Sequence, residues 1–250
     1  MRRVLLLLVA GCSSHAQPAA APDADVADVA EPDAPAAMAD ASGVPLAGFG
    51  DLSGACGVLT VANLTDGTPA LFRDTLTFMR RYNDPADRPL LTAGGQRLAA
   101  TPNAGGSSGL SEIFAYEELA RCELADLLKT ETEIVYDTTG KITDMEVMVD
   151  GHKIGVSVTR AQTYPLGQPY PLDTATTLIS RKLTDIQTST ADVSAQDRWD
   201  KQILAVLAWD TQAADMVEQA WNGLDASVKA NTLVIVTSTD GDDTFIYTNM

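Results

Sequence analysis

The chain has 250 residues, and 34 Asp and Glu against 17 Lys and Arg give it a formal net charge of −17 at pH 7. A surface this acidic repels phosphate backbones, which argues against nucleic acid as a partner. The sequence holds only three Cys and two His. That number disfavours zinc sites, which are built from three or four such ligands in one place.

The first residues have the layout of an export signal, with two arginines, the apolar run 4–10 and then Cys12. The apolar run is too short to span a bilayer as a helix, which takes about 20 residues. Residues 8–12 resemble a bacterial lipobox, whose cysteine is acylated and becomes the mature N-terminus. The resemblance implies a lipoprotein signal peptide that ends in a lipidated Cys12, and Ser13 after it implies the outer membrane. The alternative is an ordinary signal peptide followed by an incidental cysteine.

The implied acyl chains predict that the protein is attached to a membrane. Each buried CH₂ contributes about 0.8 kcal/mol, and more than one chain is attached to such a cysteine. We therefore expect an outer-membrane, lipid-anchored protein that faces the periplasm or the cell surface. Removal of Arg2 and Arg3 with the signal would make the mature chain still more acidic.

A change in composition separates a tether from a folded domain. Residues 13–49 are rich in Ala, Pro and Asp and contain no Lys or Arg. This composition predicts a disordered acidic tether, with an ion-binding tail as the alternative. Residues 50–250 are long enough to form a single domain with a sizeable core.

The first part of this domain is predicted to be an N-terminal β-hairpin followed by a helix. Segments 58–62 and 71–79 read as two strands joined around Asp66-Gly67. Ser111 is a candidate N-cap for the helix. The apolar residues of that helix recur at three- and four-residue spacing: Ile113, Tyr116, Ala120, Leu124, Leu127 and Leu128.

Three short strands follow, at 132–136, 142–149 and 153–158, with Asp150-Gly151 as a tight hairpin turn between the last two. We then expect helices, a buried strand and a last short strand. Their ranges are 173–186, 195–209 and 213–221 for the helices, and 232–237 and 244–247 for the strands. This order predicts an α/β domain with a central mixed sheet flanked by helices.

The predicted order of elements resembles the core of the PD-(D/E)XK, or restriction-endonuclease-like, superfamily. That core has a helix, a three-strand meander, a crossover helix and a strand. The resemblance covers about residues 111–237 and implies a restriction-endonuclease-like core behind the N-terminal hairpin. In that family an acidic residue opens the second strand and binds the metal, and Asp144 stands at this position. Some members add an acid from the first helix, for which Glu112 or Glu117 is the candidate.

The third strand departs from the family's pattern of acid, spacer and lysine. Ser157 replaces the acid, Thr159 replaces the lysine, and Arg160 is the nearest cation. The family's hydrolysis needs two or more carboxylates to hold Mg²⁺ or Mn²⁺. Arg160 can stabilise a developing negative charge but stays protonated and cannot act as a base. The cations Arg181, Lys182 and Lys201 are candidates for an anion-facing edge near Arg160, with a solvated helix face as the alternative.

The two cysteines that remain when Cys12 is lipidated are Cys56 and Cys122. In an oxidising compartment they are a possible disulfide pair. Two buried free thiols are the alternative, because the sequence does not show the distance between them.

Three functional hypotheses follow. The first is a lipid-anchored envelope protein whose nuclease-like domain is non-catalytic, requires no cofactor and binds or scaffolds an unknown envelope protein or ligand. The second is a phosphodiesterase or nuclease that depends on a divalent metal and uses Asp144 with Glu112 and Arg160. In the third, the fold resemblance is accidental and the domain recognises an envelope component in another way.

Overall fold

The computed structural model describes residues 44–46, 48–82, 85–102 and 108–248. The chain divides into two units, and all described residues belong to the second, Asp40–Met250. The predicted signal peptide with Cys12, and the tether as far as residue 43, lie outside the described residues. Within the described ranges, no helix is both long and apolar enough to cross a membrane.

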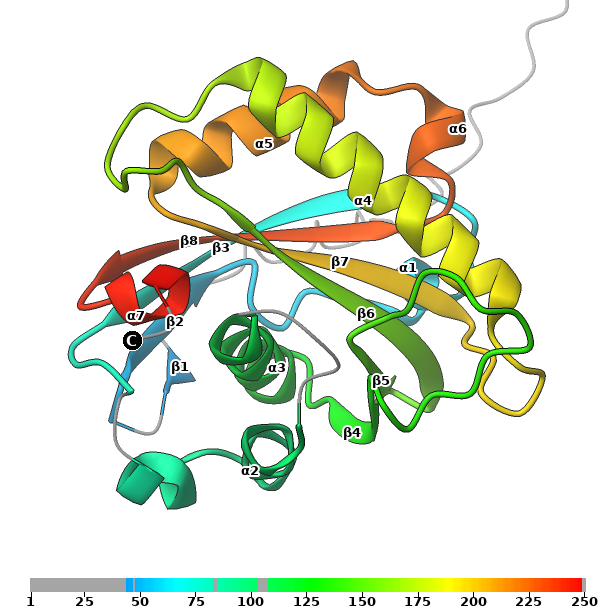
Figure 1. Ribbon diagram of the computed structural model, residues 1–250, viewed down its shortest axis with the longest axis horizontal. Coiled ribbons are helices and arrows are strands. Elements are labelled where there is room, and N and C mark those ends of the chain that lie inside the picture. Colours follow the sequence, from blue (N-terminus) through cyan, green and yellow to red (C-terminus); the bar gives the residue numbers. More distant parts are fainter. Residues whose placement is uncertain (1–43, 47, 83–84, 103–107, 249–250) are drawn as a thin grey trace, which may run out of the picture. The chain divides into compact units, whose positions relative to one another are not determined.

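One eight-stranded mixed sheet runs through the second unit (Figure 1). The strand order across the sheet is β1-β2-β3-β8-β7-β6-β5-β4. The four inner strands, β3, β8, β7 and β6, are parallel, and antiparallel strands extend the sheet on both sides. The bounds are β1 (Val44–Pro45), β2 (Gly50–Gly54), β3 (Ala70–Phe78), β4 (Asp126–Thr130), β5 (Met145–Val149), β6 (His152–Ala161), β7 (Lys201–Ala208) and β8 (Leu233–Gly241).

Helices cover both faces of this sheet (Figure 1). On one face lie α4 (Leu172–Asp192) and α5 (Thr211–Gly223), which pack against each other and against the parallel strands. On the other face lies α3 (Gly109–Cys122), with α2 (Ala93–Ala100) packed against it. The remaining short helices are α1 (Val61–Thr65), the 3₁₀ helix η1 (Pro85–Leu90), α6 (Ala226–Lys229) and α7 (Thr244–Thr248). The predicted α/β architecture, a central mixed sheet flanked by helices, is confirmed.

The apolar runs of the central strands explain this layering. Every residue of β7 is buried, and β8 is buried from Leu233 to Thr239. Strands that are covered on both faces read as continuous apolar runs, as these two do. Their side chains enter two separate cores, one under α4 and α5 and one under α3.

A third core of aromatic rings joins the start of the domain to its end. Phe114 of α3 makes edge-to-face contacts with Phe49, Phe78 and Phe245, whose centroids lie 5.1 to 5.8 Å from its own. Such contacts add to the stabilisation from buried area. Phe49 is completely buried although it precedes residue 50, where we expected the domain to start.

Several predicted elements are confirmed in type and approximate position. Strand 71–79 is β3, strand 153–158 is part of β6, and strand 232–237 is part of β8. Helices 173–186 and 213–221 correspond to α4 and α5. The Asp150-Gly151 turn closes the β5–β6 hairpin, with both residues at positive φ, as a two-residue turn of this kind requires.

The predicted N-terminal hairpin is wrong in its first strand. Residues 61–65 form α1 instead, because Thr60 and Asn63 make a reciprocal capping box that satisfies the amides of the first turn. The antiparallel partner of β3 is β2, which lies earlier in the chain.

The boundary between the first helix and the first meander strand was also misplaced. The helix begins after Ser108 rather than Ser111 and ends at Cys122. Leu124 adopts a left-handed conformation with φ of 54°, which no α-helix continues through. The strand is therefore 126–130, and the predicted strand 132–136 contains turns and a single bridge at Tyr136.

Two further predictions near the C-terminus are wrong. The predicted helix 195–209 contains β7, whose apolar run has no polar face and lies between β6 and β8. The predicted strand 244–247 is α7. Its residues Phe245, Ile246 and Tyr247 all enter the same aromatic core, whereas successive residues of a strand point to opposite faces of the sheet.

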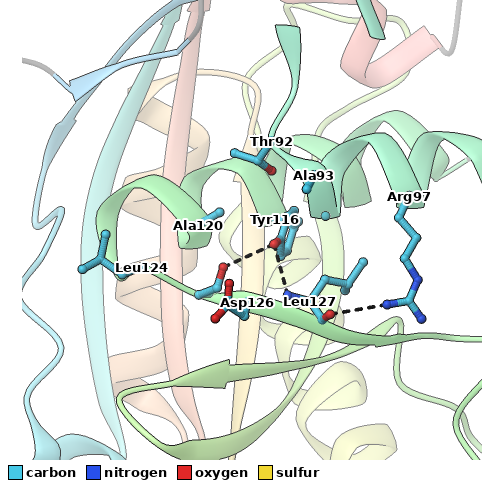
Figure 2. Close-up of a pocket in the computed structure, with 10 residues that line it drawn as sticks. Thr92, Ala93, Arg97, Tyr116, Ala120, Leu124, Asp126 and Leu127 are labelled. Carbon is cyan, nitrogen blue, oxygen red and sulfur yellow. Dashed lines mark hydrogen bonds between the residues drawn. The ribbon is translucent and has the colours of Figure 1, made fainter. Parts of the chain in front are cut away.

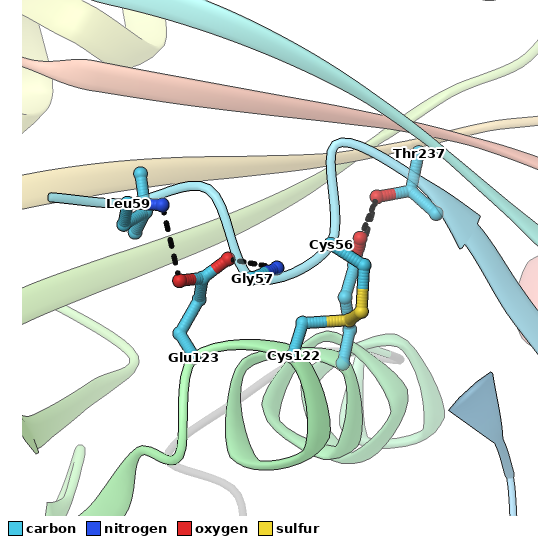
Figure 3. Close-up of a disulfide and its surroundings, with 7 residues drawn as sticks. Cys56, Gly57, Leu59, Cys122, Glu123 and Thr237 are labelled. Carbon is cyan, nitrogen blue, oxygen red and sulfur yellow. Dashed lines mark hydrogen bonds between the residues drawn. A yellow bond between two sulfur atoms is a disulfide. The ribbon is translucent and has the colours of Figure 1, made fainter. Parts of the chain in front are cut away.

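Cys56 and Cys122 form a disulfide, with a Cα–Cα distance of 4.7 Å (Figure 3). It ties the segment after β2 to the last residue of α3. Next to it, the Glu123 carboxylate accepts hydrogen bonds from the amides of Gly57 and Leu59, at 2.8 and 3.2 Å. The end of α3 is thus held by one covalent link and two hydrogen bonds.

Candidate functional site

A polar cleft opens where β6 runs on beyond β5. The short strand β5 pairs with β6 only from His152 to Val156, while β6 continues to Ala161. The start of α3, the segment around residues 140–144 and the middle of α4 surround this extension and enclose a cavity of about 480 Å³. The cavity is lined among others by Ser111, Glu131, Asp144, Ser157, Arg160 and Lys182.

Asp144 lies at the inner end of the cleft, one residue before β5. Its amide donates to the Val156 carbonyl at 3.1 Å, and its Oδ2 accepts from the Val158 amide at 2.6 Å. Burial and the negative charge of Glu112 raise the pKa of Asp144 to about 7, against the lowering effects of the Val158 amide and Lys182. Near neutral pH this carboxyl therefore changes its protonation state easily.

Two further carboxylates act on Asp144. Glu112, in the first turn of α3, is 6% exposed and accepts a 2.6 Å hydrogen bond from the Ser108 hydroxyl. Glu131 follows β4, and its negative charge raises the pKa of Asp144 as well. Together with Asp144 they border a small adjoining cavity of about 30 Å³.

Three cations line the cleft, and one of them, Lys141, pairs with Asp185 at 3.1 Å. Lys182 of α4 donates from Nζ to the Val158 carbonyl at 3.3 Å. The backbone N–H of Val158 thus binds Asp144, and its C=O binds Lys182. Arg160 of β6 donates to the carbonyl oxygen of Ile246 at 2.9 Å, and burial lowers the pKa of its guanidinium. The cleft therefore brings negative and positive groups from several elements together around the end of β6.

The two hydroxyls predicted to replace the family's acid and lysine both face this cleft. Ser157 is 5% exposed and Thr159 is half-buried. Residues two apart on a strand share a face, as expected. Arg160, from the opposite face of the strand, also lines the cavity because the cavity extends around the edge of β6 that β5 leaves uncovered.

The donor set does not fit a metal ion held by the protein alone. Across residues 44–46, 48–82, 85–102 and 108–248, no three His, Cys, Asp or Glu side chains converge closely enough to hold one. One oxygen of Asp144 is already bonded to an amide and one of Glu112 to a hydroxyl. A Ser in place of the second strand acid supplies only a weak ligand.

The structure brings most of the predicted site residues together. Asp144, Ser157 and Arg160 line one cavity, and Glu112 acts on both Asp144 and Arg160. Lys182 lines the same cavity as Arg160, whereas Lys201 is buried elsewhere and bonds the carbonyl groups of Asp66 and Thr68.

Two other acidic residues have positions that the sequence did not indicate. Glu117, the second candidate for the helix acid, binds Arg121 at 2.8 Å and accepts from Thr92, so it belongs to the α2–α3 contact. Glu131 was missed. It lies in the turn after β4, just before the predicted strand 132–136, and no local pattern marks it as a site residue.

Another cavity, of about 500 Å³, lies between α2, the end of α3 and β4 (Figure 2). Its polar groups bond to the edge strand. Tyr116 donates to the Ala125 carbonyl and accepts from the Leu127 amide, and Arg97 donates to the Leu127 and Leu128 carbonyl groups. These contacts protect the open edge of β4 from pairing with another chain. The Asp144 cleft remains the better candidate for chemistry or binding.

Comparisons with known proteins add one relative. No family model and no solved structure matches the chain. The AAC-rich mRNA clone AAC4 protein of Dictyostelium discoideum is 41% identical over 153 residues, which are 59% of this chain and 22% of that protein. The chain thus spans about a fifth of the relative's length, and the relative's name states no activity.

Proposed function

We propose that the described domain is a nuclease-like binding or scaffolding domain without hydrolytic activity. The observation that carries the proposal is the position of Asp144. Elements α3, β4, β5, β6, α4 and β7 follow one another in the order of the restriction-endonuclease-like core. Asp144 immediately precedes the second strand of the meander and bonds the third, where that family keeps its metal-binding acid.

The altered chemistry of the cleft favours binding over hydrolysis. Ser157 and Thr159 stand where an acid and a lysine would hold the metal and the reacting groups. With a pKa of about 7, Asp144 is protonated in a substantial fraction of molecules at neutral pH, and a protonated carboxyl is a poor metal ligand. The domain therefore needs no cofactor in this account.

The cleft would suit a polar ligand with an anionic group, such as a side chain of an envelope protein. Lys182 and Arg160 offer donors to the anion, and Ser157 and Thr159 offer hydroxyls that donate or accept. When Asp144 is ionised, its carboxylate can accept a hydrogen bond from the same ligand. The same cleft is lined by the carboxylates of Glu131, Asp144 and Asp185, so a ligand there meets both signs of charge.

The alternative is a phosphodiesterase or nuclease that depends on Mg²⁺ or Mn²⁺ and uses Asp144. In its favour, Glu112, Glu131 and Asp144 border a cavity of about 30 Å³, which has room for a water molecule or a small ion. Carboxylates that repel one another would gain from a divalent cation. Cleavage of DNA or RNA that requires the divalent ion and is lost in Asp144→Asn would establish this alternative and refute the non-catalytic proposal.

We also propose that the domain is held at the outer membrane through acylated Cys12. The Cys56–Cys122 disulfide supports an oxidising compartment. Mass analysis of the protein extracted from membranes should find acyl chains on Cys12, and Cys12→Ser should move the protein to the soluble fraction. An unmodified Cys12, or a variant that stays in the membrane, would contradict the anchor.

A further inference from the structure

Two buried carboxyl groups meet between α3 and the sheet, away from the Asp144 cleft. Asp74 of β3 is 6% exposed and Glu118 of α3 is 2% exposed. The side chain of Thr237 in β8 lies near the disulfide at the end of α3 (Figure 3). Its hydroxyl is 2.6 and 2.8 Å from the two Glu118 oxygens. Asp74 is the register partner of Thr237 in the parallel β3–β8 pair, so the Asp74 and Glu118 carboxyl groups both flank the Thr237 side chain.

The surroundings of this pair contain no compensating charge. Within the described ranges, neither Asp74 nor Glu118 takes part in an ion pair. The segment after β2 contributes the Ala55 amide, β8 contributes the Thr237 hydroxyl, and the end of α3 contributes Glu123, which is negative. Arg73 points to α5, where it pairs with Asp215 and Glu218.

Two adjacent carboxylates cannot both ionise in such a place. Burial raises the pKa of Asp74, and burial together with the charge of Asp74 raises the pKa of Glu118 well above its usual value. Like charges that share a buried site keep one proton between them. The folded protein thus holds a proton that the unfolded chain releases near its ordinary carboxyl pKa.

We propose that Asp74 and Glu118 form a proton-dependent latch, in which one shared proton fastens α3 to β3 and β8 and its loss at alkaline pH loosens the helix. The disulfide at Cys122, one turn further along α3, keeps the end of the helix attached when the latch is open. The first turn of α3 carries Glu112 and forms a wall of the Asp144 cleft. The latch itself does not depend on what that cleft binds.

The test follows unfolding of the full chain in urea between pH 5 and pH 9, for wild type and Glu118→Gln. A proton held only by the folded state makes the unfolding equilibrium constant rise with pH, by up to about tenfold per pH unit. Gln cannot lose that proton, yet its amide can still donate to Asp74 and accept from Thr237. The ratio of the wild-type constant to the variant constant should therefore rise at least about tenfold between pH 5 and pH 8.

An unchanged ratio across this range would overturn the latch. Asp137→Asn, at an exposed position, is the matched control and should track the wild type at every pH. If Glu118→Gln does not fold, Asp74→Asn removes the negative charge of the other half of the pair and should reduce the pH dependence, although burial still raises the pKa of Glu118. A measurement on the wild type needs no variant: at pH 8 an infrared band of a protonated carboxylic acid should persist, and its absence would also overturn the latch.

Discussion

Replacing both Cys56 and Cys122 by Ala is expected to lower the free energy of unfolding by about 4 kcal/mol, the chain-entropy value for residues 66 apart. The disulfide closes a loop that includes β3, α2 and the whole of α3. Without it, the unfolded chain gains the conformational freedom of that loop. In the folded state, the segment after β2 still has its hydrogen bonds to Glu123 near the end of α3.

Urea unfolding of the double variant against the oxidised wild type measures this effect. Reduced wild type is the control, because it lacks the bond but keeps both sulfur atoms in place. We expect the double Ala variant and the reduced wild type to have similar free energies of unfolding, about 4 kcal/mol below that of the oxidised wild type. A loss below about 1 kcal/mol would mean that the unfolded chain is already restrained near these residues.

Replacing Asp144 by Asn is expected to stabilise the protein at pH 8 by at most about 4 kcal/mol, which is the shift from 3.8 to about 7 at 1.36 kcal/mol per pKa unit. The folded state binds the Asp144 proton more tightly than the unfolded chain. Stability is therefore lost as pH rises from about 4 to about 7, and the full penalty applies above pH 7. Asn has no charge to bury and its oxygen can still accept from the Val158 amide.

Urea unfolding at pH 4 and pH 8 distinguishes this effect from a general change in packing. At pH 4 the variant and the wild type should have nearly the same stability, because Asp144 is then largely protonated in the folded state. The exposed substitution Asp137→Asn should change little at either pH. A variant that is less stable than the wild type at pH 8 would show that the Asp144 charge is compensated within the cleft.

The fold was predictable where an element had a distinct period or a distinct turn. The apolar stripe of α4, the continuous run of β8 and the Asp150-Gly151 turn each identify their structure locally. The strand β7 was not predictable in this way, because six apolar residues in a row fit a buried helix as well as a buried strand. Only its neighbours β6 and β8 decide between the two.

The candidate site was predictable to the extent that its residues lie on the meander. Asp144, Ser157 and Arg160 follow from the order of the elements, and Glu112 follows from the helix before them. Glu131 comes from a turn whose position depended on where α3 ended, and that depended on the left-handed Leu124. The contact of Asp74 with Glu118 joins positions far apart in the chain, so no local pattern could reveal it.

The most direct test of the account is photo-crosslinking from the rim of the Asp144 cleft in intact cells. A photoreactive residue would replace Ile142, which lines the cleft and is 47% exposed, or as a control Val61, which is 51% exposed on α1. We predict an adduct with an envelope component from position 142 alone, lost when Lys182→Met is added and the domain remains folded. No adduct from position 142, or one that Lys182→Met leaves unchanged, would contradict a binding role for this cleft.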